Sequence, residues 1–166
     1  MESNEEMKSI KITERNSILK FGLIDENNNP TGEYLEFDTE DIEIPIRLNE
    51  SIERHKKNLR WLKTAIDLVE KEPNYTGKKL LTSHQEKELR IINDFYKKEM
   101  EAFDYAFGKD TSKKLLNGRK PYFTMFDDFT KMLEPVMNQI GMGYKKVKEK
   151  IVEKYSNINK GDDVIE

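Results

Sequence analysis

The residues best suited to do chemistry lie in the segment FGKDTSKKLLNGRKPYF, residues 107–123. Gly108 and Lys109 precede the hydroxyl groups of Thr111 and Ser112, a combination that is typical of loops that bind phosphate. In such a loop a second glycine stands five positions earlier, so that backbone N–H groups can surround the anion, and a buried strand leads into the loop. A nucleotide site would need both features.

The segment lacks both features. The residue five positions before Gly108 is Phe103, and a helical pattern rather than a strand leads into the glycine. Asp110 would also place a negative charge where phosphate should lie. We therefore interpret the segment as a connector in which Gly108 follows a helix end. Asp110 caps a short helix over residues 111–116, and the pair Asn117-Gly118 ends it.

The two histidines, His55 and His84, each lie in a charged context with no motif around them. We expect both to be surface side chains rather than metal ligands or catalytic groups. No nucleophile stands beside a base in a recognisable signature. The sequence therefore predicts a protein that is not an enzyme, with no catalytic residue and no cofactor.

Three carboxylates, Asp127, Asp128 and Glu134, raise the question of a metal site. Their neighbours Phe126 and Phe129 have the spacing of an inward-facing helical stripe. Both aspartates then fall largely on the solvated side, so we predict no metal site. The chain has no cysteine, which excludes disulfides and thiolate ligands.

The segment GYKKVKEKIVEKY, residues 143–155, holds five lysines and two glutamates. Its lysines could contact phosphate, and Tyr144 and Tyr155 could stack on bases. The segment has no arginine, however, and the net charge of the whole chain is −3. We therefore expect a solvated helix face rather than a nucleic-acid surface.

Charge is distributed unevenly along the 166 residues, because residues 1–53 hold 14 acidic and 5 basic side chains. This asymmetry favours an acidic N-terminal element beside, or in exchange with, a basic helical part. Uneven charge is also common in ordinary domains. No apolar run is long enough to cross a membrane, and the first residues lack an apolar signal segment, so we expect a cytoplasmic protein.

Two alternating segments predict a β-hairpin near the N-terminus. In SILKFGLID the apolar residues Leu19, Phe21 and Leu23 share one face, and EYLEFD alternates in the same way. The ENNNPTGE stretch between them is a dense turn signal. Residues 41–48 could add an extended edge segment, because Pro45 keeps this run off a central strand position.

The rest of the chain has helical patterns. Asn49 can cap a helix that runs to about Glu72, and Ser83 with Glu86 predicts a capping box at the start of a second helix. A third helix is expected near Pro121, which suits a first helical position.

The last part of the chain contains helix-breaking residues. Pro135 is expected to kink or end the third helix, and Gly141 and Gly143 bracket a further break before a short last helix. The predicted fold is α+β, mainly α: an N-terminal β-hairpin followed by an antiparallel bundle of three or four helices. The predicted organisation is a flexible N-terminus at 1–14, a single domain at 15–155 (hairpin and extended segment 15–48, helical bundle 49–155) and a flexible tail at 156–166.

The third helical segment has more apolar side chains than one buried stripe requires. We predict a protein-binding surface formed by Phe123, Met125, Phe126, Phe129 and Met132, because flexible methionine side chains suit adaptable apolar surfaces. The alternative is a second packed face of the same core.

The segment 88–129 resembles small proteins that are encoded in the tail-gene region of phages and prophages of Gram-positive bacteria and are identified as tail assembly chaperones. The shared pattern is an amphipathic helix ending in F-D-x-x-F-G, then a T-S-x-K-x-hydrophobic segment, then N-G or G-G, then an aromatic helix with F-D/E-D-F. This chain supplies Phe103-Asp104, Phe107-Gly108, Thr111-Ser112-Lys113-Lys114, Asn117-Gly118 and Phe126-Asp127-Asp128-Phe129.

The resemblance implies a non-enzymatic protein in the cytoplasm of a bacterial host. Its expected partners are the tape measure protein, which it would keep soluble, and the tail tube protein, which would displace it; self-association is a further expectation. The alternatives are a structural protein of the tail or of the head–tail junction, and a small regulatory or anti-defence binding protein.

Overall fold

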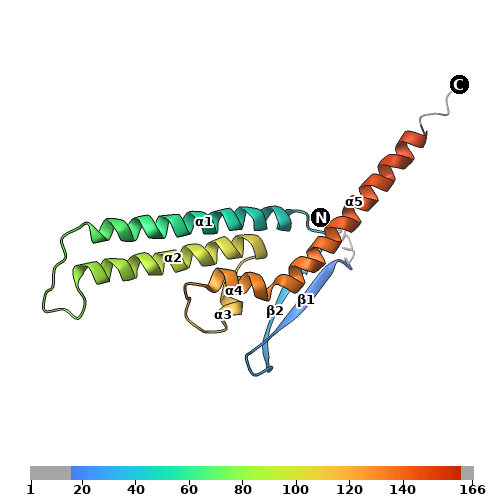
Figure 1. Cartoon of the computed structure of the whole chain (residues 1–166). Coiled ribbons are helices and arrows are strands. Elements are labelled where there is room, and N and C mark those ends of the chain that lie inside the picture. The colour runs from blue at the N-terminus through green and yellow to red at the C-terminus, as the bar shows by residue number, and fades with distance from the viewer. Residues whose placement is uncertain (1–15, 162–166) are drawn as a thin grey trace, which may run out of the picture.

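The computed structural model of the chain describes residues 16–161 (Figure 1). The predicted flexible N-terminus at 1–14 lies outside these residues. The α+β class, mainly α, is confirmed, with a two-stranded hairpin followed by helices. The elements in chain order are β1 Ile18–Ile24, β2 Pro30–Asp38, α1 Glu43–Glu70, α2 Ser83–Phe107, α3 Thr111–Leu116, α4 Met125–Met132 and α5 Glu134–Gly161.

The predicted hairpin is present, and β1 pairs antiparallel with β2. Its turn is held by Asp25, whose Oδ1 accepts hydrogen bonds of 2.8 Å from the backbone N–H groups of Asn27 and Asn29. The inward face of β2 consists of Leu35 and Phe37, which are both buried. The alternating pattern therefore predicted the correct strands and the correct apolar face.

The extended segment predicted at 41–48 is wrong, because α1 already begins at Glu43. Pro45 lies in the first helical turn, where no intrahelical partner exists for an N–H group and a proline is tolerated. The side chain of Asp41 accepts a 2.9 Å hydrogen bond from the N–H of Glu43. The helix therefore starts six residues before the predicted cap at Asn49.

The capping box of α2 is also shifted by one residue from the prediction. The N-cap is Thr82, whose Oγ1 accepts from the N–H of Gln85, while Oε1 of Gln85 accepts from the N–H of Thr82 at 2.9 Å. Ser83 instead fastens the loop between α1 and α2, because its Oγ accepts from the N–H of Tyr75 at 2.9 Å.

A tight joint connects α2 to α3. Gly108 has φ of 102° and Asp110 has φ of 64°, so the chain reverses sharply at the end of α2. Asp110 precedes α3 as predicted, but its side chain makes no capping bond. The carboxylate of Asp104 does so instead, accepting from the N–H of Ser112 at 2.7 Å and of Asp110 at 3.1 Å. Asn117, with φ of 48°, ends the helix as predicted.

The second half of the chain differs from its predicted boundaries. The third helix predicted from the sequence corresponds to α4. This helix starts four residues after Pro121 and ends before Pro135 as predicted. No break occurs at Gly141 or Gly143, because α5 is continuous. Residues 156–161, predicted as flexible tail, belong to α5, and residues 162–166 lie outside the described part.

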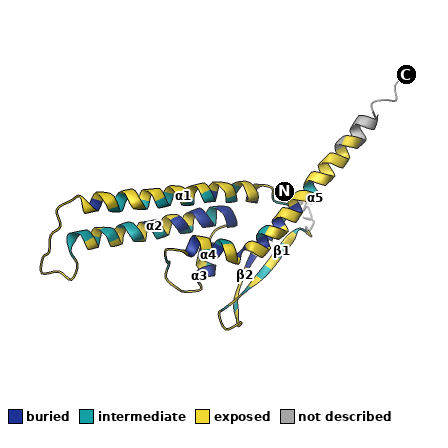
Figure 2. Ribbon diagram, in the orientation of Figure 1, coloured by how far each residue is buried: buried dark blue, intermediate teal, exposed yellow. Residues whose placement is uncertain are grey.

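The core is formed where the end of α2 meets α3, α4, the first half of α5 and β2 (Figure 2). Phe103 lies at its centre, with ring centroids 4.8 Å from Phe107, 5.3 Å from Phe129 and 5.7 Å from Phe126. The antiparallel pair of α1 and α2 extends away from this core on one side, and α5 extends away on the other (Figure 1). Within residues 16–161 no helix combines the length and apolarity needed to span a membrane.

Gly143 is required where α5 crosses the chain after β2. A Cβ atom at this position would lie 1.8 Å from the carbonyl oxygen of Thr39, which is backbone and cannot easily move. At Gly141 an added Cβ would meet nothing within 4 Å. Gly143 is thus required for close packing and does not break the helix.

The two glycines give a matched test of this contact. Gly143→Ala should lower the free energy of unfolding by about 1–3 kcal/mol, because overpacking forces the backbone apart. Gly141→Ala should raise it by up to about 1 kcal/mol, since alanine favours a helix more than glycine does. Urea denaturation of both variants measures the difference; equal effects of the two substitutions would contradict the close approach of α5 to Thr39.

Candidate functional site

The segment that resembles a phosphate loop has no room for an anion. Thr111 and Ser112 are buried, so their hydroxyl groups are not offered to a ligand. The N–H groups at the start of α3, where phosphate would bind, already donate to the carboxylate of Asp104. A side chain of the protein therefore occupies the anion position.

His55 is not the surface side chain that we predicted. Its Nδ1 is hydrogen-bonded to Oε2 of Glu99, which is only 1% exposed. The Nδ2 of Asn58 donates to the other carboxylate oxygen at 2.8 Å. One face of the imidazole ring stacks on the ring of Phe126, with ring centroids 4.2 Å apart and an interplanar angle of 4°. His55 thus joins α1, α2 and α4.

The His55–Glu99 pair does not form part of a metal-binding group. Among the residues that the structure describes, no group of three or more histidine and carboxylate side chains is arranged to hold a metal ion. Asp127 is exposed, with Oδ1 3.9 Å from Nε2 of His55. The hydrogen bond that His55 donates to the Glu99 carboxylate raises the pKa of His55 above its ordinary value of 6.5, against the opposing effect of burial. The pair serves helix packing.

The five residues predicted to bind a protein divide into two groups. Met125, Phe126 and Phe129 are at most 4% exposed and belong to the core, so they are not available as contacts on this surface. Their position matches the alternative of a second packed face. Phe123 is 56% exposed and Met132 is 50% exposed.

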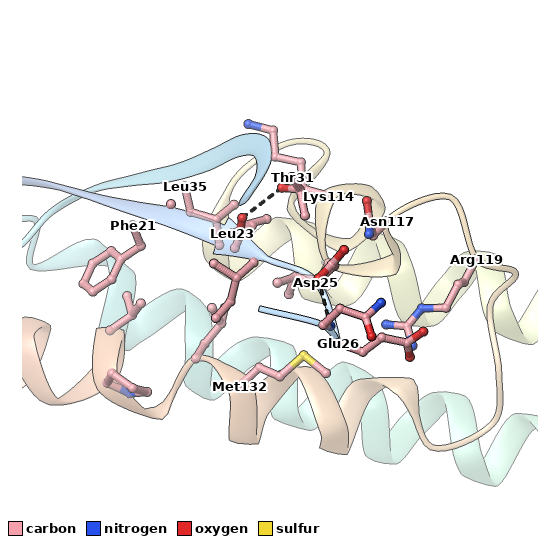
Figure 3. Close-up of a pocket in the computed structure, with 17 residues that line it drawn as sticks. Phe21, Leu23, Asp25, Glu26, Thr31, Leu35, Lys114, Asn117, Arg119 and Met132 are labelled. Atoms are coloured by element: carbon pink, nitrogen blue, oxygen red, sulfur yellow. Dashed lines mark hydrogen bonds between the residues drawn. The ribbon is translucent and has the colours of Figure 1, made fainter. Parts of the chain in front are cut away.

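Met132 lines an open apolar recess of about 660 Å³ between the hairpin turn, α3 and the junction of α4 with α5 (Figure 3). In Figure 3 the side chains of Phe21 and Leu23 project from the strand on one side, and Met132 projects from the helix on the other. Both strand residues are only half buried and pack against the edge of the core. The buried floor consists of Leu35, Leu115, Leu133 and Val136.

The rim of the recess carries charges of both signs. Asp25 and Glu26 lie at the hairpin turn, and Lys114 and Arg119 lie at α3 and the loop that follows it. Lys114 also ties α3 to the hairpin, donating to the backbone carbonyl of Tyr34 at 3.1 Å. The arrangement suits an apolar segment of another protein, with polar groups able to pair at its edges.

A comparison with family models matches residues 31–162, from β2 through the end of α5. The model is that of a family of unknown function, DUF6673. The chain belongs to this family. The match spans the α2–α3 joint and every helix that lines the recess, so the DUF6673 unit contains the recess except for the walls formed by β1 and the hairpin turn. Neither a curated protein nor a solved structure matches the chain.

The His55–Glu99 pair predicts a pH dependence of stability. Because the folded-state pKa of His55 is raised, its protonation stabilises the fold; this contribution is complete below its ordinary value of 6.5 and is lost as the pH rises through the raised value. The free energy of unfolding should therefore fall between about pH 6 and about pH 8.5, and His55→Gln should remove most of that fall.

Urea denaturation at the two pH values measures this effect. His84→Gln is the control, because it removes the other histidine of the chain, which lies near the surface and contacts a backbone carbonyl of Glu72. It should keep the wild-type pH dependence. A fall of the same size in His55→Gln and in the wild type would contradict the role of the pair.

Proposed function

We propose that this chain is a phage tail assembly chaperone that binds the tape measure protein and keeps it soluble until the tail tube polymerises around it. The observation that carries the proposal is the apolar recess with its exposed Met132 and Ile24. A tape measure protein is long and largely helical, so that its apolar stripes would aggregate without a cover. A recess open on one side can accept such a stripe.

The motif that resembles tail assembly chaperones builds this recess. Asp104 and Gly108 set the angle between α2 and α3, which brings Leu115 to the floor and Lys114 to the rim. The F-D-D-F stretch buries two phenylalanines in the core. Met132 shares a helical face with the buried Met125, seven residues earlier, but it is the last residue of α4 and is 50% exposed.

The size of the recess predicts weak binding per copy. It has room for two or three large apolar side chains, and full burial of each contributes about 1.5–3 kcal/mol. After the entropy lost on association, which costs about 4 kcal/mol or more, the expected affinity of one copy is about 0.2 mM or weaker. Weak, reversible binding by many copies suits a protein that the tail tube protein must later displace.

The proposed role is non-enzymatic and belongs to the cytoplasm of the bacterial host. It requires no cofactor, no metal and no nucleic acid. The chaperone should be absent from finished particles; finding it in purified virions at a fixed ratio to tail proteins would favour the structural alternative instead.

Binding should depend on Met132. Met132→Glu should weaken capture of a co-expressed tape measure fragment by about tenfold or more, because a carboxylate in the recess must lose its water. Met142→Glu is a matched control, since both methionines are 50% exposed and Met142 does not line the recess. Affinity measured by calorimetry should be unchanged in the control.

Equal weakening in both variants would show that added charge, not the recess, decides binding. If the wild-type chain does not bind the tape measure fragment at all, the proposed function is wrong.

A further inference from the structure

The apolar stripe of α5 continues beyond the part of the helix that packs on the domain. Val136, Ile140 and Gly143 are buried, and Val147 is half buried. Ile151, the next residue at helical spacing, is 53% exposed. In Figure 1 this half of α5 projects past the hairpin and away from the core. One continuous stripe is therefore covered in its first half and open in its second.

A groove lies beside the open half of the stripe. It has a volume of about 750 Å³ and runs between the first turns of α1 and the middle of α5. Its exposed apolar side chains include Ile42 at 54%, Ile46 at 58% and Val152 at 56%. This α1–α5 groove is separate from the recess and shares no lining residue with it.

The projecting half of α5 gains little stability by itself. Helices of fewer than about 12–15 residues are marginal in water, and most helical stability in proteins comes from packing an apolar face. Exposed apolar patches with polar surroundings mark interaction sites. Both arguments predict that this stripe is covered when the protein is at work.

The charges on either side of the groove identify what covers it. Residues 145–154 of α5 carry five lysines and two glutamates. Residues 40–50, at the start of α1 and in the link before it, carry four acidic side chains and one basic side chain, Arg47, which pairs with Asp41 and Glu43. This stretch therefore keeps a net negative charge. Within one chain Lys150 already pairs with Glu40 at 3.3 Å, so the two surfaces attract each other.

We infer that two copies of this chain associate through their α1–α5 grooves, each placing the open half of its α5 against the start of the other copy's α1. A second copy supplies apolar side chains for Ile151 and Val152 and acidic groups for the lysines beside them. The interface is self-complementary, so every contact occurs twice, as in most symmetric dimers. The recess stays free, and the dimer goes beyond the proposed function.

Sedimentation velocity of the full chain tests this inference. The wild type should be a dimer at about 50 μM, and Ile151→Asp should weaken the dimer by about tenfold or more. Ile46→Glu should do the same from the α1 side. Both side chains are more than half exposed, so the fold should be retained, which circular dichroism checks.

Lys146→Gln is the matched control, because it changes the net charge by the same amount as Ile151→Asp. Lys146 lies five positions before Ile151, about 140° around the helix, and faces away from the groove. This variant should remain a dimer. A wild-type chain that is monomeric at this concentration overturns the inference, and so does a dimer that survives both groove variants.

The dimer and the proposed function can fail separately. Met132→Glu should leave the dimer intact, and Ile151→Asp should leave binding of the tape measure fragment at the recess intact. Binding of the fragment by a wild-type chain that stays monomeric would overturn the dimer and leave the proposed function standing.

Discussion

The structure depends on one carboxylate, that of Asp104, and on the two backbone N–H groups that it accepts from. Asp104 lies in the last turn of α2 and reaches forward to Asp110 and Ser112 at the start of α3. Hydrogen bonds to a charged group are worth about 1.5–3 kcal/mol each when they are well formed. Together with the positive φ of Gly108, these hydrogen bonds fix the direction in which the chain leaves the α1–α2 pair.

Everything after the joint follows from that direction. The short helix α3 packs under the hairpin, α4 returns across the end of α2, and the stop before Pro135 sends α5 out along the hairpin. Gly143 lets α5 pass against the backbone of Thr39. The two open apolar surfaces are products of this path: the recess lies where α5 begins, and the α1–α5 groove lies where it leaves the domain.

Features that depend on neighbouring residues could be predicted from the sequence. The hairpin followed from alternation, and the limits of α3 followed from Gly108 and the Asn-Gly pair. The cap of α3 was assigned to Asp110 because that residue stands directly before the helix. The carboxylate that accepts the capping bonds is six residues further back, and nothing in local spacing separates the two candidates.

Features that depend on distant residues could not be predicted. His55 and Glu99 are 44 positions apart, so their pairing needs the register of α1 against α2. The role of Gly143 requires the position of Thr39, more than a hundred residues earlier. The recess was missed for the same reason: alternation predicts that Phe21 and Leu23 share an apolar face, but their partial exposure and the helix opposite them are known only from the fold.

The central claim is that the surface shaped by the Asp104 joint is the one that holds the partner. Hydrogen–deuterium exchange of the full chain, with and without a tape measure fragment, tests it most directly. The claim predicts slower exchange in residues 21–26, 114–119 and 132–136, which line the recess, and little change at the outer end of the α1–α2 pair. Protection confined to the outer end of α1 and α2, with the recess peptides unchanged, would contradict it.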